Sequence, residues 1–294
     1  MKVLKKIVAL ALFGSLYFTI SVCQAPFTNY DPDYVNISSV LHDGDKYKLV
    51  YMKRGESGNR IKVKYFGARD FDGTSVPDRF IKWSKGKNII CLSSGGYMDN
   101  TQTPVGLTVD NGIEVNNNLK EFDGLVIVYA TGGVVATNLK NGDLNIKSDK
   151  FPQGKVIDLR KKPMDKGIFM QWCKEESATV FQTHLLAYKN QLTIGTNSEQ
   201  TKRERRFLAV GTEDGKVVHV IAHNPSYTSL YEGSRRTLKF LKEFKGMEVT
   251  FMINLDPGAQ DVFFLFDKNG QINKSIVGTV PIEDAANLLV YYYE

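Results

Sequence analysis

The feature of this sequence that most restricts its fold is a series of short apolar or alternating segments separated by turn-forming residues. This pattern is typical of β-strands joined by tight turns. The paired segments are residues 47–52 with 60–66, 105–109 with 113–115, 125–129 with 134–137, 207–210 with 217–221, and 262–266 with 272–277. Two of the intervening turns, Asn111-Gly112 and Asn269-Gly270, contain the Asn-Gly pair that favours a hairpin. Five candidate hairpins predict mostly antiparallel sheets.

Only a few segments have the periodicity of a helix. Residues 162–177 carry Met164, Ile168 and Trp172 at four-residue spacing, which predicts one apolar helical face. Residues 234–245 end before Gly246, a residue that favours helix termination.

The second predicted helix leads directly into residues 249–255, a nearly continuous apolar run. Such a run predicts a strand that is covered on both faces. The last aromatic run, Tyr291-Tyr292-Tyr293, predicts an edge strand. We therefore expect an α+β fold with mixed, mostly antiparallel β-sheets and a few packed helices.

The first 23 residues have the three parts of a secretory signal peptide. Three lysines precede the uncharged apolar residues 7–20, and small residues follow around Cys23. The apolar stretch is shorter than the roughly 20 residues that a membrane span needs. We expect cleavage near Gln24 and a secreted or periplasmic protein without a stable membrane span. An N-terminal anchor helix and a lipoprotein anchored at Cys23 are the alternatives.

Residues 24–294 contain no Pro-rich, Ser-rich or low-complexity linker, which predicts a single domain. The formal charge of +6 falls to +3 when the three lysines of the signal are removed, and this balance gives no indication of nucleic-acid binding. Cys91 and Cys173 remain, either as a disulfide or as two buried thiols. The sequence has no zinc-type spacing of Cys and His, so no cofactor is expected and any need for a metal is unknown.

Three segments, taken in order, carry a resemblance to a known family. The first contains Ser94-Gly95-Gly96-Tyr97, and the second contains Gln182-Thr183-His184-Leu185 followed by the strand from Arg206. The third is Asn254-Leu255-Asp256 with the loop 257–260. Together they resemble the phosphodiester glycosidase family, which includes the lysosomal uncovering enzyme and bacterial envelope proteins. The resemblance spans residues 89–267.

The sequence departs from the family pattern at four places. Ser94 replaces an Asn, Thr183-His184 replaces Gly-Pro, and Arg206 stands one residue further from its Ala-Val-Gly strand. Pro-Gly-Ala-Gln at 257–260 replaces Gly-Gly-Gly-Ser. Two of these changes fall on loops that would shape the site.

The resemblance implies hydrolysis of a sugar whose anomeric oxygen is linked to a phosphodiester. A phosphate anion needs fixed donors, and a guanidinium fork matches two phosphate oxygens. Arg206, or its neighbour Arg205, is the candidate for this role. Gly95 and Gly96 are candidates because backbone N–H groups of Gly-rich turns approach anions closely.

The sugar side of the reaction requires a carboxylate that delivers water and stabilises a cationic sugar. Asp256 is the candidate, and His184 is a second acid/base candidate. Asn254 lies two residues before Asp256, on the same strand face. Asn254, Tyr97 and Gln182 are candidates for binding the sugar. Each of these residues also has a purely structural interpretation, as a turn or core residue.

Two functions follow from the sequence. The first is an exported hydrolase that cleaves a sugar 1-phosphodiester in an envelope or extracellular glycoconjugate. The alternative is a non-catalytic relative of the same fold that binds a glycan or a protein partner. Asp256, Asn254 and Arg206 favour the hydrolase, whereas the altered loops favour the binding protein.

Overall fold

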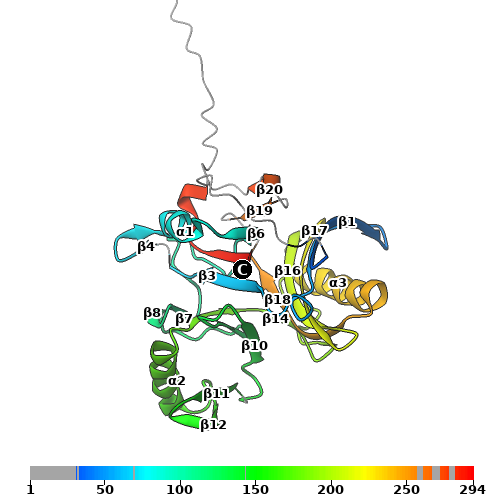
Figure 1. The fold of residues 1–294 in the computed structure, drawn as a ribbon. Coiled ribbons are helices and arrows are strands. Elements are labelled where there is room, and N and C mark those ends of the chain that lie inside the picture. Colours follow the sequence, from blue (N-terminus) through cyan, green and yellow to red (C-terminus); the bar gives the residue numbers. More distant parts are fainter. Residues whose placement is uncertain are drawn as a thin grey trace, which may run out of the picture.

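The structure is a computed structural model that describes residues 31, 33–68, 70–142, 144–256, 261–266, 272–277 and 282–294. The predicted signal peptide with Cys23, the loop 257–260 and the turn Asn269-Gly270 lie outside these residues. Figure 1 shows three sheets around a common centre, each with a helix on one side.

The strands form three sheets and two small hairpins. Sheet I has the order β1 (Val35–His42), β2 (Asp45–Met52), β17 (Lys216–Thr228), β16 (Arg203–Glu213), β18 (Glu248–Leu255), β14 (Leu185–Tyr188) and β15 (Gln191–Leu192). Sheet II has the order β10 (Val134–Asn138), β9 (Gly124–Val128), β13 (Thr179–Thr183), β7 (Thr108–Asp110) and β8 (Ile113–Asn116). Sheet III has the order β20 (Ile272–Val277), β19 (Val262–Phe266), β6 (Asn88–Ser93), β21 (Leu288–Tyr293) and β3 (Ile61–Phe66). The hairpins are β4 (Asp70–Phe71) with β5 (Thr74–Ser75), and β11 (Leu144–Ser148) with β12 (Phe151–Ile157).

Three α-helices lie in the described part of the chain, together with a short 3-10 helix at Ile282–Asp284. Helix α1 (Val76–Ser84) packs beside sheet III, α2 (Pro163–Glu175) beside sheet II, and α3 (Leu230–Lys245) beside sheet I. None of the described helices is long and apolar enough to cross a membrane.

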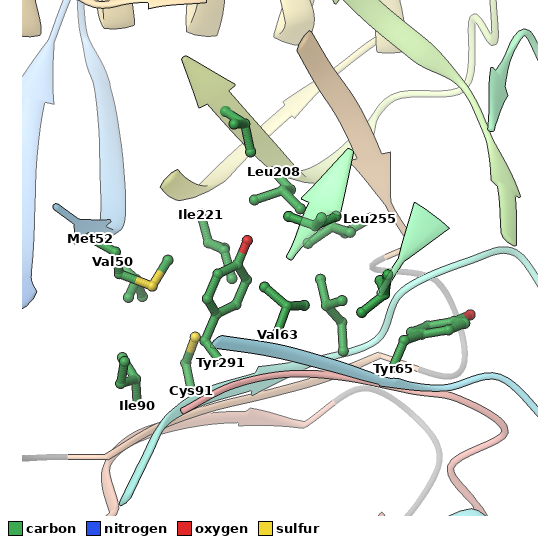
Figure 2. Packing of buried hydrophobic residues seen from close by; sticks show 14 of the residues in the cluster. Val50, Met52, Val63, Tyr65, Ile90, Cys91, Leu208, Ile221, Leu255 and Tyr291 are labelled. Carbon is green, nitrogen blue, oxygen red and sulfur yellow. The ribbon is translucent and has the colours of Figure 1, made fainter. Parts of the chain in front are cut away.

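The main core lies between sheets I and III, and side chains from β9, β10 and β13 of sheet II also contribute to it. Figure 2 shows Val50, Leu208 and Leu255 from sheet I facing Val63 and Tyr291 from sheet III. All five are buried. One buried hydrogen bond also joins the two sheets here, between His219 Nδ1 and the Tyr291 hydroxyl at 3.0 Å. This packing explains why residues 249–255 are almost uniformly apolar, since β18 is covered by sheet III on one face and by α3 on the other.

The α+β class is confirmed, and every strand pairing among the described residues is antiparallel. Four of the five predicted hairpins are confirmed: β7 with β8, β9 with β10, β16 with β17, and β19 with β20. The fifth, between residues 47–52 and 60–66, is wrong. β2 pairs with β1 and β17, whereas β3 pairs with β21.

The segment between β2 and β3 therefore carries the chain from sheet I to sheet III. Gly55 is held against β17, because its N–H donates to Val217 O at 2.8 Å. A Cβ on Gly55 would lie 2.8 Å from Val217 N, so only glycine fits this approach. A turn-rich segment thus serves as a crossover, which local sequence does not distinguish from a hairpin.

The helices differ in detail from the prediction. The buried face of α2 consists of Asp165, Phe169, Trp172 and Cys173, whereas Met164 is 85% exposed. Asp165 belongs to this face because its carboxylate accepts a hydrogen bond from Asp158 N at 2.8 Å.

Helix α3 begins one turn earlier than predicted. Its cap is Ser229, whose hydroxyl accepts from Glu232 N, and Leu230 is fully buried in its first turn. Helix α1 was not predicted; Ser75 caps it, and Val76 and Phe80 are buried.

The edge-strand prediction for the C-terminal tyrosines is wrong. β21 lies between β6 and β3 in sheet III, and all three rings are buried. Aromatic residues on both faces of a strand here reflect burial on both sides. Cys91 and Cys173 are both buried, free thiols, and burial raises the pKa of each.

Strand β18 provides a direct test of this packing. Ile253 is fully buried between the sheets, whereas Thr250 on the same strand is exposed. We expect Ile253→Ala to lower the free energy of unfolding by about 2–5 kcal/mol, because it leaves a cavity in the core. Thr250→Ala should change it by less than about 0.5 kcal/mol. Urea denaturation measures both, and equal losses would contradict the assignment of faces.

Candidate functional site

The candidate site lies where the chain passes from one sheet to another. Only His184 stands between β13 of sheet II and β14 of sheet I, and Asp256 follows the end of β18. The end of β6 in sheet III leads towards Gly95. Backbone hydrogen bonds join these ends: Asn254 N donates to His184 O at 3.1 Å, and Asp256 N donates to Gly95 O at 2.9 Å.

The alternation of side chains decides which arginine reaches this site. Arg206 on β16 is paired in register with Leu255 on β18, so these two side chains share one face of sheet I. Successive residues of a strand point to opposite faces. Arg205, Asn254 and Asp256 therefore share the other face, and the Asp256 charge acts on the Arg205 guanidinium.

Arg205 is a buried cation with unused donors. Its side chain is 1% exposed, and its guanidinium donates to Thr228 O (3.1 Å), Glu199 Oε2 (3.2 Å) and Thr201 O (2.6 Å). Of its five N–H groups, two have no acceptor in the described part of the chain. Burial, followed by the charge of Arg203, lowers the pKa of Arg205 to about 10, so it remains charged at neutral pH.

The Tyr97 hydroxyl and the Asn254 amide form a polar pair beside this cation. Tyr97 Oη accepts from Asn254 Nδ2 at 2.6 Å, which leaves the hydroxyl hydrogen for another acceptor. Burial, followed by the Asp256 charge, raises the pKa of Tyr97 well above its usual value, so the phenol keeps its proton.

Asn254 Oδ1 is buried and accepts no hydrogen bond from the described residues. An unsatisfied buried acceptor costs about 1–3 kcal/mol. A donor from a ligand or from solvent would remove this cost. Asn254 therefore offers an acceptor, Tyr97 a hydroxyl donor and Arg205 two guanidinium donors, in addition to the Asp256 carboxylate.

His184 adds a ring to the same site. Its ring centroid lies 4.7 Å from that of Phe122 and 5.6 Å from that of Tyr97. Burial lowers the pKa of His184; Asp123 opposes this shift, and Arg205 adds to it. The imidazole is therefore neutral at pH 7, when it can accept a proton.

Gln182 lies on β13, and backbone groups occupy every hydrogen-bonding position of its side-chain amide. Its Oε1 accepts from Leu107 N (2.9 Å) and Lys120 N (3.0 Å). Its Nε2 donates to Lys120 O (3.2 Å) and Phe122 O (3.0 Å). An amide has two acceptor positions and two donors, so none is left for a substrate.

The N–H groups of Gly95 and Gly96 are also occupied. Gly95 N donates to Asn287 Oδ1 at 2.6 Å, and Gly96 N donates to the Tyr65 hydroxyl at 3.2 Å. A Cβ on Gly95 would overlap the Tyr65 ring. Gly95 is therefore required by close packing, whereas a Cβ on Gly96 would be a tight fit at 3.2 Å from the Tyr65 hydroxyl. Neither glycine has a free amide for an anion.

Arg206 lies on the face of sheet I opposite to Asp256. Its side chain is fully buried and pairs with Asp261 through Nη1–Oδ1 (2.5 Å) and Nη2–Oδ2 (3.2 Å). Nη1 also donates to Ser93 Oγ (3.3 Å), and the guanidinium carbon lies 4.2 Å from the centroid of the Phe263 ring. Arg206 therefore joins sheet I to sheet III, and the predicted meeting of Arg206 with Asp256 does not occur.

Of the predicted residues, the structure brings together Asp256, Asn254, Tyr97 and His184. It also places Arg205, which was predicted as the alternative to Arg206, on the same face as Asp256. Residues that the prediction did not include are Phe122, Arg203 and Glu199. Glu199 pairs with both Arg203 and Arg205. The run of basic residues at 202–206 was the only sequence signal for this part of the site.

The described ranges contain no group of three or more His, Cys, Asp or Glu side chains that could hold a metal. No protein-family model matches the chain, and no curated protein matches it significantly.

Solved structures show a distant likeness. The catalytic domain of zebrafish N-acetylglucosamine-1-phosphodiester alpha-N-acetylglucosaminidase, auto-inhibited by its pro-peptide, is 15% identical, with a TM-score of 0.46 over 88% of this chain and 82% of that one. A hypothetical protein from Synechocystis is 12% identical, with a TM-score of 0.48 over 88% of this chain and 62% of that one. A protein from Burkholderia pseudomallei that is proposed to be exported is 10% identical, with a TM-score of 0.42 over 85% of this chain and 74% of that one.

The ion pair of Arg206 gives a stability prediction. Arg206→Met leaves the Asp261 carboxylate buried without its partner, so we expect a loss of about 3–5 kcal/mol in the free energy of unfolding. Arg235 pairs with Glu232 on the exposed surface of α3, and Arg235→Met should cost about 0–1 kcal/mol. Chemical denaturation distinguishes the two. A small effect of Arg206→Met would mean that the pair does not join the sheets.

The His184 ring gives a pH prediction. We expect its NMR titration midpoint below 6.5, because burial disfavours the charged form. Its contribution to stability is then complete above pH 6.5 and is lost as the pH falls towards the folded-state pKa. Loss of the resonance in His184→Asn assigns it. A midpoint at or above 6.5 would contradict the buried position.

Proposed function

We propose that this protein is an exported hydrolase that cleaves a sugar 1-phosphodiester in an envelope or extracellular glycoconjugate. Two independent lines support the proposal: the ordered motifs that resemble phosphodiester glycosidases, and the arrangement of their residues at the end of β18. The observation that carries it is the placement of Asp256 on the same face as Arg205, a buried guanidinium of which two N–H groups have no acceptor among the described residues.

In this proposal Arg205 binds the phosphodiester in place of Arg206. Two parallel N–H donors of a guanidinium match two phosphate oxygens, and burial strengthens the interaction. Arg203 is partly exposed and its charge acts on both Arg205 and Tyr97. The two arginines share a single carboxylate, Glu199, so the group has a net positive charge that favours an anion.

The reaction requires water to attack the anomeric carbon. Asp256 accepts a proton from this water, the new bond forms at the anomeric carbon, and the bond from that carbon to the phosphate oxygen breaks. The phosphate monoester leaves with the electron pair, so the leaving group needs little help from an acid. Asn254 Oδ1 accepts a hydrogen bond from a sugar hydroxyl, and the Tyr97 hydroxyl donates a hydrogen bond to a sugar oxygen. His184 is a neutral acceptor nearby.

A second candidate function is binding without catalysis. The observation that favours it is that the Gly95 and Gly96 N–H groups already donate to Asn287 and Tyr65. No backbone N–H of these two glycines is then available to bind the phosphate anion. In that case the same residues would bind a glycan phosphodiester and release it unchanged.

Asp256→Asn is the decisive variant. We expect it to reduce kcat on sugar 1-phosphodiesters of glucose, mannose and N-acetylglucosamine by roughly a hundredfold or more, because it removes only the charge. Asp149→Asn, at an exposed turn of the β11–β12 hairpin, is the matched control and should be unchanged. Arg205→Lys should mainly raise KM, because the fork is lost while the charge stays.

The wild-type protein separates the two functions. Turnover that survives Asp256→Asn would refute the role of this carboxylate. A wild type that binds these diesters in calorimetry but releases no phosphate monoester would establish the binding function and exclude the hydrolase.

A further inference from the structure

Phe122 is an aromatic residue that the sequence motifs do not include. It lies in the connection between β8 and β9 and is partly exposed. Its ring is stacked on Tyr97 with centroids 5.2 Å apart and an interplanar angle of 28°. The His184 ring meets it at 4.7 Å and 63°. The three rings form a cluster that we call the aromatic wall.

The aromatic wall borders the polar groups of the candidate site. Tyr97 belongs to both, since its hydroxyl accepts from Asn254 and its pKa responds to the Asp256 charge. Ligand pockets commonly combine aromatic side chains with a few convergent polar groups. The face of an aromatic ring is electron-rich, so it attracts the weakly positive C–H groups of a pyranose ring.

Phe122 is held in place by side chains that contact its backbone rather than its ring. Gln182 donates from Nε2 to Phe122 O at 3.0 Å and binds Lys120 through both its N–H and its carbonyl. Gln182 is buried on β13, whose position sheet II fixes on both sides. Arg160, whose side chain is partly exposed, donates to Phe122 O at 2.8 Å and to Lys120 O at 3.0 Å.

The segment that carries Phe122 has no regular secondary structure to orient it. Residues 117–123 contain neither helix nor strand. It is also held by Leu139 N, which donates to Asp123 O at 2.8 Å, and by Leu119, which packs against a buried core cluster. Gln182 and Arg160 are the side chains that bind Phe122 O itself, so we expect a change at Gln182 to shift the Phe122 ring. The Gln182 amide itself has no free donor or acceptor for a ligand.

We propose that Phe122, with Tyr97, contacts the sugar ring of the substrate, and that Gln182 is the positioning residue that holds Phe122 in this place. The inference rests on the proposed function, since it names the part of the same site that contacts the sugar rather than the phosphate. It assigns Gln182 an indirect role, in contrast to direct binding.

The test is a double-mutant cycle between Phe122 and Gln182, measured on the sugar 1-phosphodiester that wild type turns over best. We expect Phe122→Ala to raise KM about tenfold, the scale of one aromatic contact, and to change kcat less than about threefold. Phe122→Tyr keeps the ring and should restore KM. Phe151→Ala, a partly exposed aromatic residue on β12, is the control and should have no effect.

Gln182→Asn shortens the side chain by one methylene, so it should raise KM in the same way. If Gln182 acts through Phe122, the double variant is no worse than Phe122→Ala alone. Effects that multiply would overturn the positioning role. A fall in kcat at unchanged KM, or a KM for Phe122→Ala equal to that of wild type, would overturn the sugar contact. Should Gln182→Asn fail to fold, Arg160→Met combined with Phe122→Ala completes the cycle from the other contact.

Direct binding separates this inference from the proposed function. Ligand-observed NMR with the free sugar 1-phosphate needs no turnover. If wild type binds it without hydrolysing any diester, the hydrolase fails. A tenfold weaker interaction in Phe122→Ala would still support the sugar contact, and equal binding would refute it. If wild type neither binds nor hydrolyses, both are wrong.

Discussion

The buried ion pair between Arg206 and Asp261 fixes the geometry on which the candidate site depends. It joins β16 of sheet I to the start of β19 in sheet III, with Ser93 of β6 as a further acceptor. Two charges removed from water are retained at low cost only when they satisfy each other. Arg206 lies on the inner face of sheet I, which packs against sheet III. The alternation of β16 therefore places Arg205 with Asp256 on the opposite, outer face, which α3 partly covers. The structural arginine and the proposed functional arginine are thus neighbours in sequence and opposite in direction.

The outer face has an electrostatic balance suited to a phosphodiester linked to a neutral sugar. Arg203, Arg205 and Glu199 together carry one net positive charge, and the Asp256 carboxylate on the same face balances it. Burial keeps Tyr97 and His184 neutral, which makes them hydrogen-bonding groups rather than competing charges. In the proposed reaction, Asp256 is the carboxylate that accepts the proton of the attacking water. The ends of strands from all three sheets meet at this point, so groups from distant parts of the sequence lie close together here.

Much of this arrangement followed from the sequence, because the signals were local. The Asn-Gly turn at Asn111-Gly112 and the apolar run of β18 predicted a hairpin and a buried strand, and both are present. Motif order placed Asn254, Asp256 and Tyr97 in one region. The remainder depended on tertiary partners. Which of two adjacent arginines faces outward is set by register with β18, and no residue near Arg206 in sequence identifies Asp261 as its partner.

Other site features depended on contacts that have no sequence pattern. Gln182 was predicted to bind sugar, yet its amide is saturated by the backbone of a distant loop. Gly95 was predicted to bind an anion, yet its missing side chain is required by the Tyr65 ring. Phe122 was not predicted, because an isolated aromatic residue in a loop carries no motif. The resemblance therefore proposed a set of residues, and the geometry brings some of them together and separates others.

The most direct test of this account is hydrolysis of a sugar 1-phosphodiester in water enriched in the oxygen-18 isotope, followed by mass spectrometry of the phosphate monoester. Attack at the anomeric carbon breaks the bond between that carbon and the phosphate oxygen, so the phosphate monoester should contain no label. A labelled phosphate monoester would show attack at phosphorus, and a diester left intact would show that the site does not hydrolyse it. Either result would contradict the proposed role of Asp256 and Arg205.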